Sequence, residues 1–295
     1  MMLVNQGESS MLKLTSGLLA IVLASGAANA QQSYTADQLV AKNLEARGGA
    51  AALAAIQSIE SEGRLITPGD FELKFKEVRK RVASGAAIRD DLSVQGLTIV
   101  QAYDGANGWR INPFQGRRDA EKMSGDEARS MADTGLITGV LQSAAATKSR
   151  VTAEGMEDFD GTLAYKLKVV QPDGDEFVYL LDPDTFLEIK MVESRRLRGT
   201  LQVTDFELGD YEKVAGVYYP MAIDQWGDGN PNQRSRLVIE KATANVDAPA
   251  SLFAQPADAA KPAAAAPGDV PKPTDKPPTD SKSDKPATPP SPSKE

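Results

Sequence analysis

The chain contains neither cysteine nor histidine among its 295 residues. Without cysteine it forms no disulfide and no thiolate metal site, so its folded part depends on an apolar core. Without histidine it lacks the usual general base near neutral pH, and serine–histidine and cysteine–histidine hydrolytic centres are excluded. These two absences favour a binding function over catalysis.

Basic residues are in the minority. Lys and Arg number 33 against 41 Asp and Glu, which gives a formal net charge of −8. No run of basic residues alternates with aromatic ones, so we expect no nucleic-acid partner. The glycine-rich stretch 105–108 precedes a predicted strand rather than a helix, and no Lys-Ser or Lys-Thr pair follows it. It is therefore not a phosphate-binding loop, and we expect no cofactor.

Residues 1–30 have the pattern of a secretory signal peptide, with Met11 as a second candidate start. Lys13 precedes an apolar run over 18–24, and small residues at Ala28 and Ala30 fit a cleavage site. The alternative is a membrane anchor. The apolar run is too short to cross about 30 Å of hydrocarbon, so we predict a cleaved signal and an exported product.

The other end of the chain is rich in Pro, Ala, Lys and Ser. Residues 259–295 hold one large apolar residue, Val270. Such a segment buries too little apolar surface to offset its ordering entropy, so we predict a disordered tail. We expect the tail to be either a solvated spacer or an extended segment that contacts partners in the cell envelope. The folded unit is then expected to span residues 31–258.

The folded unit is mainly β. Its clearest segment is 97–114, in which an alternating strand breaks at 104–108 and resumes at Trp109. Similar patterns through the unit predict about eleven strands in a single antiparallel sheet. We expect this sheet to curve into an unclosed half-barrel. The apolar phase changes between Phe75 and Val78, which predicts a β-bulge near Lys76.

Two helical segments interrupt the strands. Thr35 and Gln38 form a capping box that begins an N-terminal helix. Ser124 and Glu127 form a second capping box before a short apolar insert, which Gly135 and Gly139 are expected to loosen. One interpretation of the insert is a crossover helix that plugs one end of the sheet. The other is a lid over a cavity.

A curved sheet with few helices has more concave apolar surface than those helices cover, which favours an apolar ligand cavity. Nine residues are candidates for its lining, although each also fits an ordinary core: Phe71, Phe75, Val78, Trp109, Ile111, Phe114, Met131, Leu136 and Leu141. Three arginines are candidates for contacts to a polar head group, with a solvated outer face as the alternative: Arg79, Arg81 and Arg110. Paired carboxylates such as Asp173 and Asp175 sit at turns, and turn chemistry explains them.

Four segments together resemble the LolA-like family of periplasmic lipoprotein carriers, the outer-membrane lipoprotein-sorting proteins. They are ADQLVAKNLEARGG at 36–49, AYDGANGWRINPF at 102–114, VYLLDPDTFLEIKM at 178–191 and DYEKVAGVYYP at 210–220. The resemblance implies an unclosed barrel with a helical lid, no catalysis and a periplasmic location. It also implies that Trp109, Ile111 and Phe114 face the cavity and that the lid includes residues 131–141.

These observations predict a monomeric, non-catalytic periplasmic carrier of acyl chains from lipids or lipoproteins. The resemblance adds inner- or outer-membrane lipoprotein-transfer proteins as possible partners. A second hypothesis is an envelope scaffold or stress sensor that binds a protein partner and uses its C-terminal tail as a tether. A third is a polysaccharide-cleaving enzyme built on a pair of carboxylates.

Overall fold

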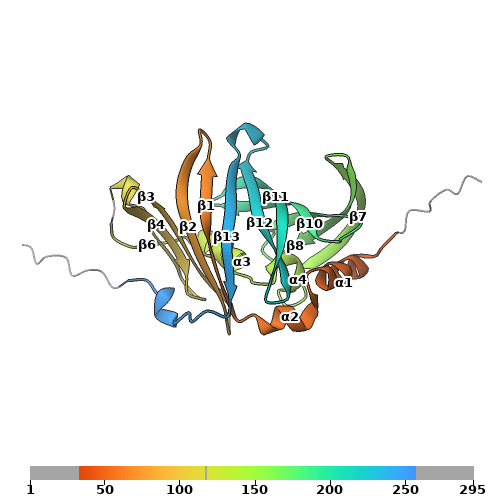
Figure 1. Ribbon diagram of the computed structural model, residues 1–295, viewed down its shortest axis with the longest axis horizontal. Helices are drawn as coiled ribbons and strands as arrows, with labels where there is room; N and C mark the ends of the chain where they lie inside the picture. The colour runs from red at the N-terminus through yellow and green to blue at the C-terminus, as the bar shows by residue number, and fades with distance from the viewer. Residues whose placement is uncertain (1–32, 117, 257–295) are drawn as a thin grey trace, which may run out of the picture.

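The computed structural model describes residues 33–116 and 118–256 (Figure 1). The predicted signal peptide and the predicted tail lie outside these residues. Within them, no helix is both long enough and apolar enough to cross a membrane.

A single antiparallel sheet of thirteen strands dominates the structure, in the order β6-β5-β4-β3-β2-β1-β13-β12-β11-β10-β9-β8-β7. The strands are β1 (Ser58–Thr67), β2 (Phe71–Val82), β3 (Gly85–Val94), β4 (Leu97–Tyr103), β5 (Gly108–Ile111), β6 (Glu121–Lys122), β7 (Arg150–Phe159), β8 (Thr162–Val170), β9 (Glu176–Leu181), β10 (Glu188–Leu197), β11 (Thr200–Val214), β12 (Val217–Gly227) and β13 (Ser235–Ala244).

The sheet consists of two meanders, β1 to β6 and β7 to β13, joined where β1 pairs with β13. It curves without closing, and β6 and β7 are its two edges (Figure 1). The predicted unclosed half-barrel is confirmed. The count of thirteen exceeds the predicted eleven partly because β6 has only two residues, too few to show alternation.

The predicted bulge near Lys76 is wrong. Strand β2 pairs without interruption through this position with both β1 and β3. The apolar phase changes because both faces of β2 are covered: Phe75 lines a cavity on the concave face, and Val78 packs against Phe253 on the convex face. A bulge does occur in β13 where it pairs with β1: Glu62 and Gly63 lie opposite Lys241 and Ile239, and Glu240 is the extra residue.

Two helices, α1 (Ala36–Ala46) and α2 (Gly49–Ala55), close one end of the half-barrel (Figure 1). The Thr35 capping box begins α1 as predicted. Gly48, at φ 118°, separates the two helices, and a Cβ there would lie 2.3 Å from the carbonyl oxygen of Gly216. Only glycine permits this approach, so Gly48 allows the two helices to pack against the turn between β11 and β12.

The segment 123–149, here called the crossing segment, connects β6 to β7. Because these strands are the two opposite edges of the sheet, the segment must run across its concave face. It contains α3 (Gly125–Thr134) and α4 (Gly139–Ser143), and the Ser124 capping box begins α3 as predicted. A Cβ at Gly135 would lie 3.1 Å from that of Ala86, so this glycine permits close packing rather than loosening the segment.

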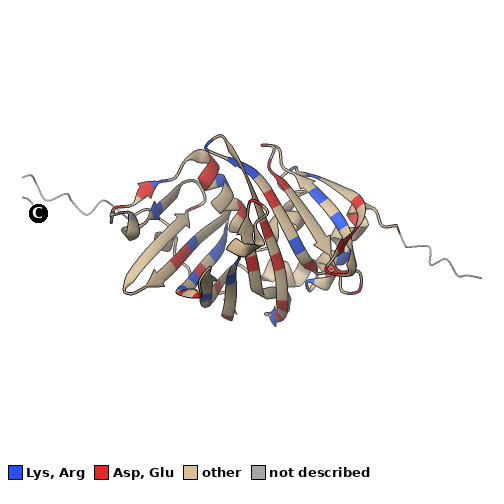
Figure 2. Cartoon of the chain, turned by 90° about the horizontal axis from the view of Figure 1, so that it is seen from above, with Lys and Arg blue, Asp and Glu red and all other residues tan. Residues whose placement is uncertain are grey.

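The convex face is partly covered and partly solvated. The C-terminal segment, which includes the 3₁₀ helix η3 (Ala250–Leu252), packs over β2 and β3 through Ala248 and Phe253. Elsewhere cross-strand ion pairs occupy this face, for example Lys76 with Glu60 at 2.9 Å. Acidic and basic residues are interspersed along the strands (Figure 2). Two further 3₁₀ helices lie in loops, η1 (Pro113–Gln115) and η2 (Pro231–Gln233).

Candidate functional site

A cavity of about 530 Å³ lies between the concave face of the sheet and the crossing segment. Its volume is in the range of small-molecule sites, about 300–1,000 Å³. Both meanders and the crossing segment contribute apolar side chains to its wall, among them Leu65, Phe75, Leu92, Ile99, Met131, Leu136, Phe206, Leu208, Ile223 and Leu237.

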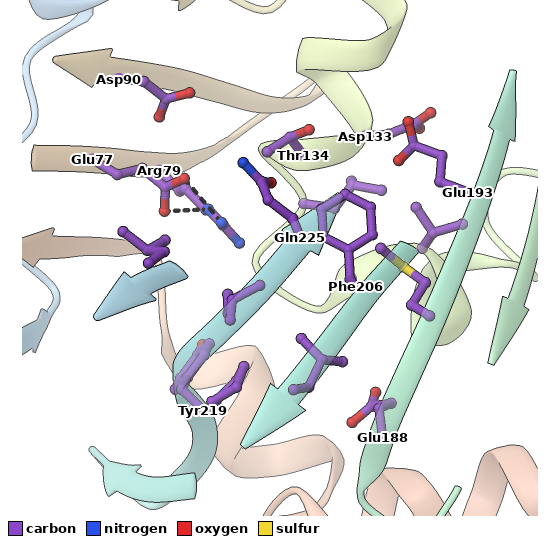
Figure 3. Close-up of a pocket in the computed structure, with 18 of the residues that line it drawn as sticks. Glu77, Arg79, Asp90, Asp133, Thr134, Glu188, Glu193, Phe206, Tyr219 and Gln225 are labelled. Carbon is purple, nitrogen blue, oxygen red and sulfur yellow. Dashed lines mark hydrogen bonds and ion pairs between the residues drawn. The ribbon is translucent and has the colours of Figure 1, made fainter. Parts of the chain in front are cut away.

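Strand alternation decides which side chains reach the cavity. On β2, Phe75, Glu77 and Arg79 point inward, and on β3 Asp90 and Leu92 do the same. The wall therefore combines apolar side chains with charged ones (Figure 3).

Three of the nine apolar candidates line the cavity: Phe75, Met131 and Leu136. Leu141 belongs instead to the core formed by α1, α4, β8 and β9. Phe71, at the start of β2, and Phe114, in η1, have 49% and 53% of their surface exposed. Val78 packs on the convex face.

Trp109 and Ile111 also lie on the convex face. They form a cluster with Val100 and Ala102, and Trp109 Nε1 donates a hydrogen bond of 2.7 Å to the carbonyl oxygen of Phe253. This placement differs from the expectation that they face the cavity. Alternation in β5 predicts which side chains share a face but not what covers that face, because the segment that covers Trp109 lies 144 residues further along the chain.

The three candidate arginines have three different surroundings. Arg79 lines the cavity. Arg81 donates to the carbonyl oxygens of Leu53 and Ile56, at 3.0 and 2.8 Å, and so caps the end of α2. Arg110 binds Glu127 at the start of α3, with 2.8 Å between Nη1 and Oε1.

Glu127 ties the crossing segment to both meanders. It receives Arg110 from β5, and Arg198 from the turn between β10 and β11 at 2.9 Å. Its carboxylate also accepts the backbone N–H of Ser124 at 2.8 Å. Partial burial raises the pKa of Glu127, but the hydrogen bonds from Ser124 and the two arginines outweigh it and lower the pKa to about 2.

One charged group on the cavity wall comprises Glu77, Arg79 and Asp90. Arg79 grips Glu77 with two nitrogens, at 2.6 and 2.9 Å (Figure 3). Asp90 pairs with Glu77 in the sheet register, and its Oδ1 is buried without a hydrogen-bond partner. Burial raises the pKa of Asp90 well above its usual range, and the neighbouring Glu77 charge raises it further.

A second group surrounds the buried Arg195. Its guanidinium lies 3.4 Å from Asp133 and 3.6 Å from Asp175, and it contacts Glu193. Burial raises the pKa of Asp133, although Gln171 and Arg195 oppose this effect. The cluster joins the end of α3 to β9 and β10.

A third group lies beside the paired helices α1 and α2. Arg47 donates to the carbonyl oxygen of Thr138 at 2.7 Å and lies 3.7 Å from Glu188. Tyr211 donates to the backbone carbonyl of Glu188 at 2.7 Å. The hydroxyl of Tyr219 is buried without a hydrogen-bond partner.

Of these polar residues, the sequence patterns predict only Arg79 as a ligand contact, and Asp175 is explained there as a turn carboxylate. The available signal was charge at inward positions of otherwise apolar strands, as at Glu77 between Phe75 and Arg79. That signal does not distinguish an inner face from a solvated outer one. The resulting site can enclose an apolar group and place it against a few fixed charges.

Comparisons with solved structures found similar folds. A domain assigned to outer membrane lipoprotein sorting, from Vibrio parahaemolyticus, has a TM-score of 0.52 and 12% identity, with 74% of this chain and 97% of that one covered. A LolA superfamily protein from Nitrosomonas europaea has a TM-score of 0.50 and 14% identity, with 75% and 98% covered.

A DUF1329 family protein from Desulfovibrio piger has a TM-score of 0.54 and 12% identity, and the match covers 75% of this chain and 98% of that protein. Searches with protein-family models and against curated proteins found no match. At such low identity these likenesses show the fold alone. The resemblance to LolA-like proteins is thereby confirmed for the fold.

Proposed function

We propose that this chain, which has the LolA-like fold, is a non-catalytic periplasmic carrier of acyl chains from lipids or lipoproteins. The observation that carries the proposal is the cavity of about 530 Å³ on the concave face, with apolar residues from both meanders and from the crossing segment. The fold likeness to a domain assigned to lipoprotein sorting supports it.

The energetics favour an acyl chain as the ligand. Transfer of about fourteen methylene groups from water to an apolar wall yields on the order of 10 kcal/mol before ordering costs. Such a gain needs no bond-making chemistry. Side chains such as Phe206, Leu208 and Leu237 supply the apolar surface for it.

The first test is native mass spectrometry of the full chain purified gently from the envelope fraction of its source. We expect a bound species with the mass of a lipid or lipopeptide. A titration with a fluorescent acyl probe should show saturable binding. A protein that is consistently empty and does not bind the probe would disprove the carrier function.

The second test blocks the cavity. Leu208 lines the cavity from β11, and Leu208→Trp should fill part of it and weaken probe binding by about tenfold or more. The matched control is Leu201→Trp on the same strand, where 53% of the leucine surface is exposed. We expect Leu201→Trp to bind the probe as the unmodified protein does. Equal binding by both variants would place the ligand elsewhere.

A further inference from the structure

Acidic groups outnumber basic ones on and immediately behind the cavity wall. The basic groups there are Arg47, Arg79, Arg195 and Arg81, whose charge acts on Tyr219. The acidic groups are Glu77, Asp90, Asp133, Asp175, Glu188 and Glu193. An anionic ligand group would therefore enter a site with an excess of negative charge and little water to screen it.

Each of these guanidinium groups already has a carboxylate or carbonyl partner, although Nε of Arg47 and Nη2 of Arg195 are buried without a hydrogen-bond partner. Arg79 grips Glu77 with two nitrogens, Arg195 lies among Asp133, Asp175 and Glu193, and Arg47 pairs with Glu188. Asp90 is the lining carboxylate for which no direct ion pair of this kind is seen within the described residues. Arg79 is its nearby cation, and two of the three guanidinium nitrogens of Arg79 contact Glu77.

Two oxygen atoms on the wall lack partners. Asp90 Oδ1 is buried and accepts no hydrogen bond, and the same holds for the hydroxyl of Tyr219, a residue with only 9% of its surface exposed. Buried polar atoms in folded proteins are nearly always paired, so unpaired ones in a cavity wall point to a ligand that supplies the missing partner. A hydrogen-bond donor suits Asp90.

We propose that the cavity selects apolar ligands whose polar end is a protonated amine, with the ammonium group seated against Asp90 and Glu77. The proposal rests on the proposed function, because the acyl or alkyl chain is held by the same cavity. It adds the chemical class of the polar end. An ammonium group would supply both the missing charge and the missing donor at Asp90.

The test uses three ligands that share one chain length and differ in the end group: tetradecylamine, tetradecanol and tetradecanoate. At pH 7 the first is a cation, the second is neutral and the third is an anion. Binding to the full chain is measured by displacement of a fluorescent acyl probe, below the concentration at which each ligand aggregates. We expect tetradecylamine to bind about tenfold more tightly than tetradecanol, and tetradecanoate to bind most weakly.

The variant Asp90→Asn tests the position. It removes the carboxyl group that would pair with the ammonium, with little change in shape, so tetradecylamine should lose about tenfold in affinity while tetradecanol binds as before. The control is Asp91→Asn on the same strand, where the carboxylate pairs with Arg89 at 3.0 Å. We expect this control to bind all three ligands as the unmodified protein does. Circular dichroism establishes that both variants are folded.

The outcomes separate the two proposals. Equal affinity for the three ligands, or a preference for tetradecanoate, would overturn the amine preference and leave the carrier function standing. An amine preference that persists in Asp90→Asn would overturn the assignment to Asp90. If the probe binds but none of the three ligands displaces it, the amine preference fails and the carrier function stands. If the protein is empty and does not bind the probe, both proposals fail.

Discussion

Trp109 shows how one residue can fasten a distant segment. It is 1% exposed, and its indole N–H is bound to the carbonyl oxygen of Phe253. The pair holds the C-terminal segment against the convex face, where the segment covers Val78 and Ala87. The residue is therefore expected to matter for stability and not for contact with a ligand in the cavity.

Replacement of this indole tests that distinction. Trp109→Ala should lower the free energy of unfolding by about 3–5 kcal/mol because a large buried side chain is removed. Trp109→Phe should cost less, since the ring packing is partly kept. Urea unfolding measures both losses. Ligand affinity of the folded fraction should not change, and a loss of affinity at full folding would instead place Trp109 at the ligand.

The lowered pKa of Glu127 predicts that the stability of the protein depends on pH. Its pKa of about 2 in the folded protein is below the ordinary 4.5, so its contribution to stability is present above pH 4.5 and is lost as the pH falls toward 2. Glu127→Gln should therefore destabilise the protein at pH 7 by about 1–2 kcal/mol, through loss of the charged capping box and its arginine contacts.

The measurement is urea unfolding of Glu127→Gln and the unmodified protein at pH 7 and at pH 3. The gap between the two proteins should narrow at pH 3, where the folded protein begins to lose the carboxylate contribution. Glu212→Gln, at an exposed position on β11, serves as the control. A gap that does not depend on pH would show that the carboxylate charge is not what stabilises this contact.

At the scale of the element, Gly63 of β1 lies opposite the bulge at Glu240 of β13. A Cβ at this position would lie 2.0 Å from the carbonyl oxygen of Val238 on β13, so the two strands approach too closely for any other residue. This contact lies in the pairing that joins the two meanders. Gly63 thus allows β1 and β13 to pair, and this pairing joins the two meanders into one sheet.

Gly63→Ala should lower the free energy of unfolding by about 1–3 kcal/mol, because the strands must separate or shift register to admit the methyl group. Gly209→Ala is the matched control in strand β11, since a Cβ there meets nothing within 4 Å. It should be neutral or slightly stabilising. Thermal or urea unfolding compares the two variants, and equal effects would contradict a special role for the bulge.

The elements themselves were largely predictable from local patterns. Both capping boxes, the hairpin around residues 104–108 and most strands follow from alternation and turn chemistry. Which face of a strand lines the cavity could not be predicted locally, because it depends on segments far away in sequence. Phe75 and Trp109 have equally clear alternation, yet one faces the cavity and the other the C-terminal segment.

At the scale of the whole molecule, the cavity exists because the chain crosses its own sheet. The two edge strands, β6 and β7, are consecutive in sequence, and the crossing segment between them supplies part of the cavity wall. Glu127 then binds one arginine from each meander. The charged groups of the wall became visible only with this arrangement, since no local pattern brings Asp90 and Tyr219 into one cavity.

The pairing of β1 with β13 also bears on the order of folding. Ile59 lies opposite Ala244, so β1 cannot complete its backbone hydrogen bonds until β13, the last strand, has been made. Loop closure over such a separation is entropically costly, and contacts of this kind slow folding. Each meander can form hairpin by hairpin while the chain emerges, whereas the half-barrel is assembled only once the final strand is available. Until then the unpaired backbone groups at the edge of β1 are open to other chains, so this strand needs protection during synthesis.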